Sequence, residues 1–416
     1  MDKILEICKK HKKIIMTIFL IGLFFYYLIW TVSQPYNSCP DEKMKWDICK
    51  YIAEHNSIPD GRDESIRDSI WGISYAFQPI LTYIICAVFV KIALLFTTNH
   101  FALVVAARLV STISMTLTIY FVIKISNKLF KDKEIYKYLF IVFIAFQPIT
   151  AFLASYINND STAILAISII IYLWILGLES NWKTKHCILL GLAVGFCALT
   201  YYNAYGYILC SALICLSSAI LNKMDAKEIA KKALIVASVA FVVAGWWFVR
   251  NAILYDGDIL GTKTQNEYGN KYAMEQYKPS ARKTPENSNE SLWHMLDDDA
   301  WIHITTRSFV GMFGYQNILM SNKIYYSYLG LWLIGGLGCL LKFKDLFIYK
   351  KEEKSKYILN YIFVIAIIIP IILSIIYSYT SDFQPQGRYI MGIIIPFTYF
   401  LVNGIQAVLE KFIKSE

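Results

Sequence analysis

Apolar stretches long enough to cross a bilayer recur along almost the whole chain, and they constrain its fold more than any other feature. A helix of about 20 apolar residues matches the hydrocarbon thickness of a membrane and satisfies its own backbone hydrogen bonds there. With 56% hydrophobic and 17% charged residues, the chain is far more apolar than a soluble protein of 416 residues. The sequence therefore predicts an all-α polytopic membrane protein, with residues 1–416 as a single transmembrane domain.

Hydropathy predicts 10–11 transmembrane segments. Nine are long and clear: 14–32, 101–123, 138–157, 162–178, 203–221, 233–253, 324–341, 357–378 and 389–409. The other two are 188–200, which is short, and 76–96. If all of them crossed, the lysine-rich segment 124–137 would lie outside, against the preference of basic loops for the cytoplasm. We therefore predict ten crossings, with both termini cytoplasmic and 76–96 re-entrant or interfacial.

This topology places two long polar loops on the outer face, at 33–75 and 254–323. A third outer connection, Asn158–Asp160, is very short. Long loops on one side of a membrane protein favour function on that side, because loops held by a rigid scaffold carry most binding and catalytic residues.

Several function classes lack support in the sequence. The net charge of +9 is spread over many short loops, which is a topology signal and does not indicate nucleic-acid binding. No Walker loop, GxGxxG motif or nucleophile elbow occurs. The acidic run Ser291–Asp299 lacks calcium-loop spacing, and His294 and His303 form no zinc pattern, so a solvated surface is the simpler interpretation of that run.

Three carboxylates lie where acid–base chemistry on a lipid-linked substrate is feasible. Asp41 and Glu42 follow the first span directly, at the depth where water and lipid headgroups meet. Asp160 lies between two spans, where a carboxylate is costly unless it is solvated or paired. The alternatives are an acidic loop start for the first two residues and an N-cap of the following helix for Asp160.

Three arginines are candidates for binding a phosphate. Arg250 follows Trp246 and Trp247 at an interface, where an arginine either grips a lipid phosphate or only anchors the helix. Arg388 opens the last span, and the helix N-terminus would add donors for an anion. Arg108 lies inside an apolar segment, so it should face the bundle interior, where it pairs with an acid or holds helices together.

Six short motifs occur in an order that resembles the GT-C superfamily of membrane glycosyltransferases, which includes protein O-mannosyltransferases and aminoarabinose transferases. They are Pro40–Glu42, Phe77–Tyr83, Ala107–Ser111, Asn158–Asp160, Trp246–Asn251 with Gly257-Asp258 after it, and Gln386–Tyr389. Each motif is weak alone, but together they cover nearly the full chain. One departure is Gln78, where those enzymes carry a Lys- or His-type residue before the proline, so phosphate binding there is in doubt.

The resemblance implies a bacterial cell-envelope enzyme with an outward-facing site and a polyprenyl-phosphate-sugar donor. Asp41 or Glu42 would be the general base, and the sugar would be transferred with inversion. Asp160 would orient the acceptor or help hold a divalent metal, which some members need. Arg250 and Arg388 would neutralise the leaving phosphate, with Arg108 as a further candidate. The acceptor would be a cell-envelope glycan, lipid or protein.

Two other classes stay open. A transporter, translocase or polymerase of lipid-linked glycans would fit the many spans and the intramembrane Arg108, although the sequence shows no internal repeat. A non-catalytic assembly protein would use 254–323 as a binding surface.

Overall fold

The computed structural model describes residues 11–131 and 133–413. Within these residues the fold is helical apart from one hairpin, β1 (Met312–Phe313) and β2 (Ile318–Leu319), which pair antiparallel. The all-α polytopic prediction is therefore confirmed. Eight of the described helices are long and apolar enough to cross a membrane.

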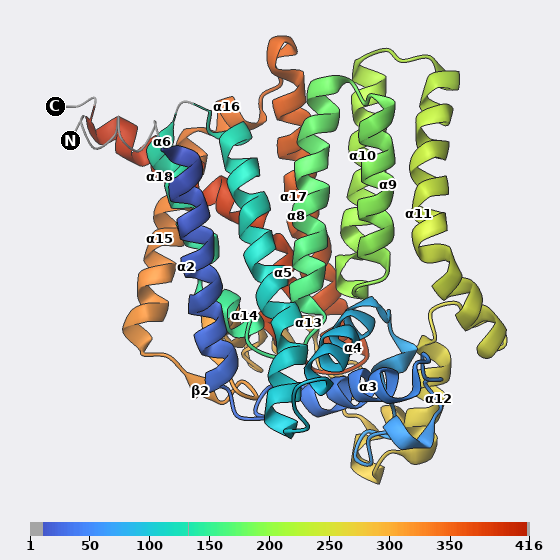
Figure 1. Ribbon diagram of the computed structural model, residues 1–416. Helices are drawn as coiled ribbons and strands as arrows, with labels where there is room; N and C mark the ends of the chain where they lie inside the picture. The colour runs from blue at the N-terminus through green and yellow to red at the C-terminus, as the bar shows by residue number, and fades with distance from the viewer. Residues whose placement is uncertain (1–10, 132, 414–416) are drawn as a thin grey trace.

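A bundle of long helices forms the body of the molecule (Figure 1). Its members are α2 (Lys12–Ser33), α5 (His100–Leu129), α6 (Glu134–Ala145), α7 (Pro148–Leu153), α8 (Asp160–Ser180), α9 (Thr184–Ala198), α10 (Tyr205–Leu221), α11 (Ala226–Leu254), α15 (Asn322–Leu341), α17 (Lys354–Thr380) and α18 (Ile394–Ile413). Helix α8 lies at the centre, whereas α2, α11 and α15 expose most of their surface. Such exposed apolar helices are stable in lipid, which solvates their side chains.

Short helices cover one end of the bundle (Figure 1). They include α3 (Glu42–His55), α4 (Leu81–Leu94), α12 (Thr262–Tyr272), α13 (Leu292–Leu296), α14 (Trp301–Gly311) and the 3-10 helices η1 (Glu64–Ile66), η2 (Tyr75–Phe77), η3 (Tyr202–Ala204), η4 (Glu275–Tyr277), η5 (Pro279–Ala281) and η7 (Gly387–Ile393). The remaining elements are α16 (Phe343–Phe347) and η6 (Lys351–Glu353).

Ion pairs identify which chain segments share each end of the bundle. Asp41 meets Arg388 at 3.3 Å, which brings the end of α2 to the start of the last span; we call this the Asp41 end. At the other end, Lys133 lies 3.9 Å from Glu410, and we call this the Glu410 end. Both α2 and α18 therefore have their outermost residues, Lys12 and Ile413, at the Glu410 end (Figure 1).

The segment 76–96 returns to the end from which it came. Helix α4 is too short for a crossing, at 14 residues, and packs between α3 and α5. The Leu81 amide donates to the carbonyl of Leu199, and Cys86 donates to that of Ala107. The α5 helix consequently begins at the same end at which α2 stops, as the ten-crossing topology predicts.

The predicted span 138–157 is not one helix. Helix α6 stops at Ala145 and α7 starts at Pro148, because proline has no amide to donate and its ring clashes with the preceding turn. The Gln147 side chain donates to the carbonyl of Phe309 across this break. An irregular stretch is tolerated at this depth because protein surrounds it. This broken segment and the short α9 make two further passes between the ends, besides the eight long helices.

Candidate active site

A cavity of about 1050 Å³ opens at the Asp41 end. Its walls come from segments that are distant in sequence: the start of α3, residues 68–78, the face of α12, the end of α17 and the chain leading into η7. The volume reaches the upper end of the range found for small-molecule pockets, so the cavity is large enough for more than one substrate group.

Asp41 lies at the cavity floor, immediately before α3. It has a left-handed backbone, with φ of 60° and ψ of 13°, which aspartate adopts more readily than most residues. Its Oδ2 lies 3.3 Å from Nη2 of Arg388 and 3.8 Å from Nζ of Lys45. Burial raises the pKa of Asp41, but Lys45 and Arg388 outweigh it, and the pKa lies below its ordinary value. The carboxylate is therefore ionised at neutral pH.

Arg388 is held against the cavity by its neighbours along the chain. Its Nε donates to Gln386 at 2.6 Å and its Nη2 donates to the Tyr389 hydroxyl at 3.1 Å. Gly387 packs so closely on α14 that a Cβ there would lie 2.0 Å from the Phe309 amide nitrogen. Arg388 was predicted to open an α-helix, but it lies in η7, and α18 begins only at Ile394. The helix N-terminus thus adds no donors at Arg388.

Lys45 is a site residue that the sequence interpretation missed. It is buried and donates to the carbonyl of Pro40 at 3.3 Å, with Nζ 5.2 Å from the centre of the Tyr75 ring. Burial lowers the pKa of Lys45, although Asp41 opposes this effect. The signal was available, because residues four apart on a helix share one face, and Lys45 follows Asp41 by four.

Asp160 is buried beside the same two cations. Arg388 and Lys45 are the positive charges that act most strongly on it, and Asp41 is the negative charge that does so. Asp160 does not line the cavity, so it lies behind Asp41. The alternative interpretation as an N-cap is wrong, because Asn159 occupies the capping position and Asp160 is the first residue of α8. The structure thus brings Asp41, Asp160 and Arg388 together, as predicted.

Glu42 points away from the cavity and forms a buried ion pair with Arg108. Its Oε1 accepts from Arg108 Nε at 2.7 Å and from the Ile157 amide at 3.3 Å, and its Oε2 accepts from Arg108 Nη2 at 2.8 Å and from the Asn37 amide at 3.0 Å. Arg108 donates its remaining bonds to the carbonyls of Thr31, Gln34 and Pro35. Both side chains are fully buried. Arg108 thus pairs with an acidic residue, which is one of the two arrangements expected for it. It does not line the cavity with Arg388 as a further phosphate ligand.

Arg250 does not line the cavity either. Its Nη2 donates to the carbonyl of Pro59 at 2.7 Å, and its guanidinium lies 5.0 Å from the ring centre of Trp247. It therefore ties α11 to the 33–75 loop. Gln78, by contrast, does line the cavity, and its buried Oε1 has no hydrogen-bond partner among the described residues.

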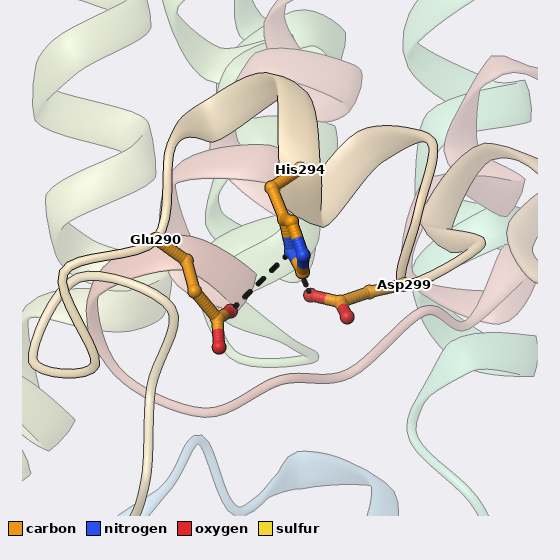
Figure 2. A group of neighbouring side chains, drawn as sticks. All are labelled: Glu290, His294 and Asp299. Atoms are coloured by element: carbon orange, nitrogen blue, oxygen red, sulfur yellow. Dashed lines mark ion pairs between the residues drawn. The ribbon is translucent and has the colours of Figure 1, made fainter.

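One group of metal-type ligands lies in the 254–323 loop, around α13 (Figure 2). His294 Nδ1 is 3.8 Å from an oxygen of Glu290 and 3.5 Å from one of Asp299, and all three side chains are partly exposed. Asp41 and Asp160 lie beside the same two cations and gather no third His, Cys or carboxylate ligand within the described part of the chain. The residues around Asp41 therefore do not form a divalent-metal site. That the protein needs a divalent metal stays a prediction.

The arrangement of the bundle and its covering helices is that of the GT-C fold. The structure is similar to the oligosaccharyltransferase of Archaeoglobus fulgidus in the apo form, with a TM-score of 0.56 and 12% identity over 95% of this chain and 51% of that chain. The oligosaccharyltransferase AglB from Archaeoglobus fulgidus, in complex with an inhibitory peptide and a dolichol-phosphate, has a TM-score of 0.55 and 12% identity over 97% of this chain and 51% of that chain. ArnT from Cupriavidus metallidurans bound to undecaprenyl phosphate has a TM-score of 0.44 and 14% identity over 94% of this chain and 77% of that chain. The chain spans about half the length of the oligosaccharyltransferase.

A family model also matches most of the chain. Residues 63–396 match DUF2142, described as a predicted membrane protein, and the chain belongs to this family. No curated protein matches it in sequence.

Proposed function

We propose that this protein is a glycosyltransferase that moves a sugar from a polyprenyl-phosphate donor to an acceptor at the Asp41 end. The observation that supports this most is the contact between Asp41 and Arg388, a carboxylate and a guanidinium at the floor of a large cavity. A base and an anion-binding cation side by side are what attack on a phosphate-linked sugar requires. AglB, which shares the fold, has been solved with a dolichol-phosphate bound.

Arg388, which lines the cavity, binds the donor phosphate in this proposal, and the buried Lys45, which does not line it, adds a positive charge beside Asp41. A guanidinium can hold two phosphate oxygens at once, and a buried ammonium adds a point charge. Both groups are held in place before the donor binds, Arg388 by Gln386 and Tyr389 and Lys45 by its position on α3. Preorganised cations stabilise the charge that develops on the leaving phosphate without further rearrangement.

Asp41 is the base. It takes the proton from an acceptor hydroxyl as the oxygen attacks the anomeric carbon of the donor sugar. A new carbon–oxygen bond forms, the bond from that carbon to the phosphate oxygen breaks, and its electron pair leaves on the polyprenyl phosphate. Attack opposite to the leaving group inverts the anomeric carbon. A positioned base of this kind contributes about 10²–10⁴-fold in rate.

Donor binding makes Asp41 a stronger base. In the structure described here, Arg388 and Lys45 hold the pKa of Asp41 low. A donor phosphate competes with Asp41 for Arg388 and adds a negative charge beside the carboxylate, and each effect raises the pKa. Asp160 helps to keep the two cations in place.

The remaining candidates have structural roles in this proposal. Glu42 and Arg108 have no hydrogen-bonding capacity directed at the cavity, so they join α3 to α5 instead of acting as base and phosphate ligand. Arg250 anchors the 33–75 loop.

The polyprenyl chain would reach the cavity along α17. Pro370, Leu373 and Ile376 of this helix line the cavity, and Leu373 and Ile376 are about half exposed. The same side chains can therefore contact lipid and substrate. We place the Asp41 end outside the cell and both termini in the cytoplasm, because Lys128, Lys133 and Lys232 gather at the Glu410 end.

The test is release of undecaprenyl phosphate from undecaprenyl-phosphate-linked hexoses by the purified full chain in nanodiscs, with cell-envelope glycan added as acceptor. We expect Asp41→Asn to lower the rate by at least about 100-fold. Asp47→Asn is the matched control, since Asp47 lies on the same helix and pairs with Lys43 at 2.8 Å. Full activity of the Asp41 variant would remove the proposed base and would favour a transporter or an assembly protein.

A further inference from the structure

One face of α12 is built from small, uncharged residues and forms a wall of the cavity. Thr262, Gln265, Asn266 and Gly269 all line the cavity, and their spacing of three, four and seven residues places them on a single helical face. The charged residues of the helix, Lys263, Glu267 and Lys271, do not line it. Lys263 and Glu267 are instead among the most exposed side chains, at 81% and 63%. The helix thus turns its hydrogen-bonding, neutral face to the cavity and its charges to solvent.

An aromatic ring is fixed beside this face. The Met274 amide donates to the carbonyl of Ile70 at 3.0 Å, which ties the segment before Trp71 to the end of α12. Gly72 has a φ of +67°, and a Cβ there would lie 2.2 Å from the Ala273 nitrogen, so only glycine permits this approach. Trp71 lines the cavity and packs on Tyr277, with 4.8 Å between ring centres. Its position relative to α12 is therefore set before any ligand binds.

Most of the charged side chains around this wall are in ion pairs, including Lys43 with Asp47 at 2.8 Å. Arg282 lies 5.8 Å from the Trp71 ring centre and pairs with Asp382 at 3.3 Å. Asp41 pairs with Arg388 at the floor. Between these pairs the lining includes aromatic and amide side chains, among them Tyr201, Tyr202, Tyr377, Asn203 and Gln384. Asp68 adds one carboxylate, which accepts from the amides of Ile70 and Trp71 and would repel an anionic ligand.

We infer that the α12 face and Trp71 form the acceptor subsite, and that the acceptor is a neutral carbohydrate; this inference rests on the proposed function. A sugar hydroxyl both donates and accepts hydrogen bonds, as do the side chains of Gln265, Asn266 and Thr262. The C–H face of a sugar ring packs on the face of an aromatic ring such as Trp71. A polyanionic acceptor would need unpaired cations, and a lipid acceptor would need an apolar wall. The apolar wall lies on α17, where the donor lipid enters.

The experiment measures binding of neutral tetrasaccharides (cello-, malto-, manno- and chitotetraose) to the full chain in nanodiscs, by saturation-transfer NMR. At least one should bind, and Gln265→Ala/Asn266→Ala and, separately, Trp71→Ala should weaken it by at least about tenfold. The matched control is Lys263→Ala, on the solvent face of the same helix, which should bind as the unaltered protein does. Tetragalacturonate and an uncharged tetrapeptide are the competing probes.

Binding of undecaprenyl phosphate to the same samples separates this inference from the proposed function. The α12 and Trp71 variants should retain lipid binding, which also shows that they are folded. No tetrasaccharide binding, tetrasaccharide binding unaffected by the α12 variants, or preferential binding of tetragalacturonate or the peptide would overturn the acceptor assignment alone. If only Arg388 variants lose undecaprenyl phosphate binding, the proposed donor site is supported, whichever of these results is found for the acceptor.

Discussion

Asp41 and Glu42 are consecutive residues, and each carboxylate meets an arginine, but the two ion pairs lie in different surroundings. Glu42 and Arg108 are fully buried and bonded, with N–O distances of 2.7 and 2.8 Å and further backbone partners. Asp41 meets Arg388 at 3.3 Å beside a large cavity, and its side chain keeps 26% exposure. The first pair has no capacity left for a ligand, whereas the second can exchange partners.

This difference separates a structural pair from a reactive one. The left-handed backbone of Asp41 ends the loop and starts α3, so the two successive side chains leave in different directions. The Glu42 carboxylate already accepts four hydrogen bonds, so it has no acceptor site left for the hydroxyl of a substrate. A carboxylate that loses its cation to an incoming phosphate becomes a better base.

The largest effect on stability is expected at the buried pair. Glu42→Gln leaves Arg108 charged and unpaired inside the protein, which should cost about 3–5 kcal/mol and lower the unfolding temperature in detergent sharply. The double substitution Glu42→Met/Arg108→Met should recover much of that loss, because no buried charge remains. A Glu42→Gln protein that is as stable as the original but cannot transfer sugar would assign the base to Glu42.

The next largest effect concerns Arg388. Arg388→Met should weaken undecaprenyl phosphate binding by about 10–100-fold, since a charge-assisted hydrogen bond contributes about 1.5–3 kcal/mol. The affinity of Arg388→Lys should lie between those of the unaltered protein and Arg388→Met, because lysine keeps the charge but loses the planar fork of the guanidinium. Equal affinity of all three proteins would show that Arg388 does not contact the phosphate.

The pH dependence tests the charge state of the floor. The folded-state pKa of Asp41 lies below its ordinary value of 3.8, so its ion pair stabilises the protein above that value and is lost as the pH falls through the folded pKa. We therefore expect kcat/KM for transfer to stay flat from pH 7 to about pH 5, since it reports the free enzyme. The acid limb of the pH profile of kcat should lie at higher pH than that of kcat/KM, because bound donor raises the pKa of Asp41. Identical acid limbs for kcat and kcat/KM would contradict the exchange of partners.

The smallest effect is expected at Arg250. Its contact with Trp247 is worth about 0.5–1 kcal/mol, so Arg250→Gln should lower stability slightly. Undecaprenyl phosphate affinity should change less than twofold in an equilibrium binding measurement. A tenfold loss would place Arg250 at the donor site after all.

Much of the architecture could be predicted from the sequence because lipid imposes simple rules. Apolar length located most spans, and the lysines of 124–137 identified 76–96 as a segment that does not cross. The break at Gln147 was missed, because hydropathy does not respond to one proline inside an apolar run. The site was harder. Asp41 and Arg388 are 347 residues apart, and only the fold shows that they meet, whereas Arg250, equally plausible by its neighbours, does not reach the cavity.

The most direct test is the affinity of Asp41→Asn for undecaprenyl phosphate, with Asp47→Asn as the control. If the donor phosphate competes with Asp41 for Arg388, removing the carboxylate charge should tighten lipid binding several-fold while transfer is lost. Unchanged or weaker binding by the Asp41 variant would contradict the competition and, with it, the proposed coupling between donor and base.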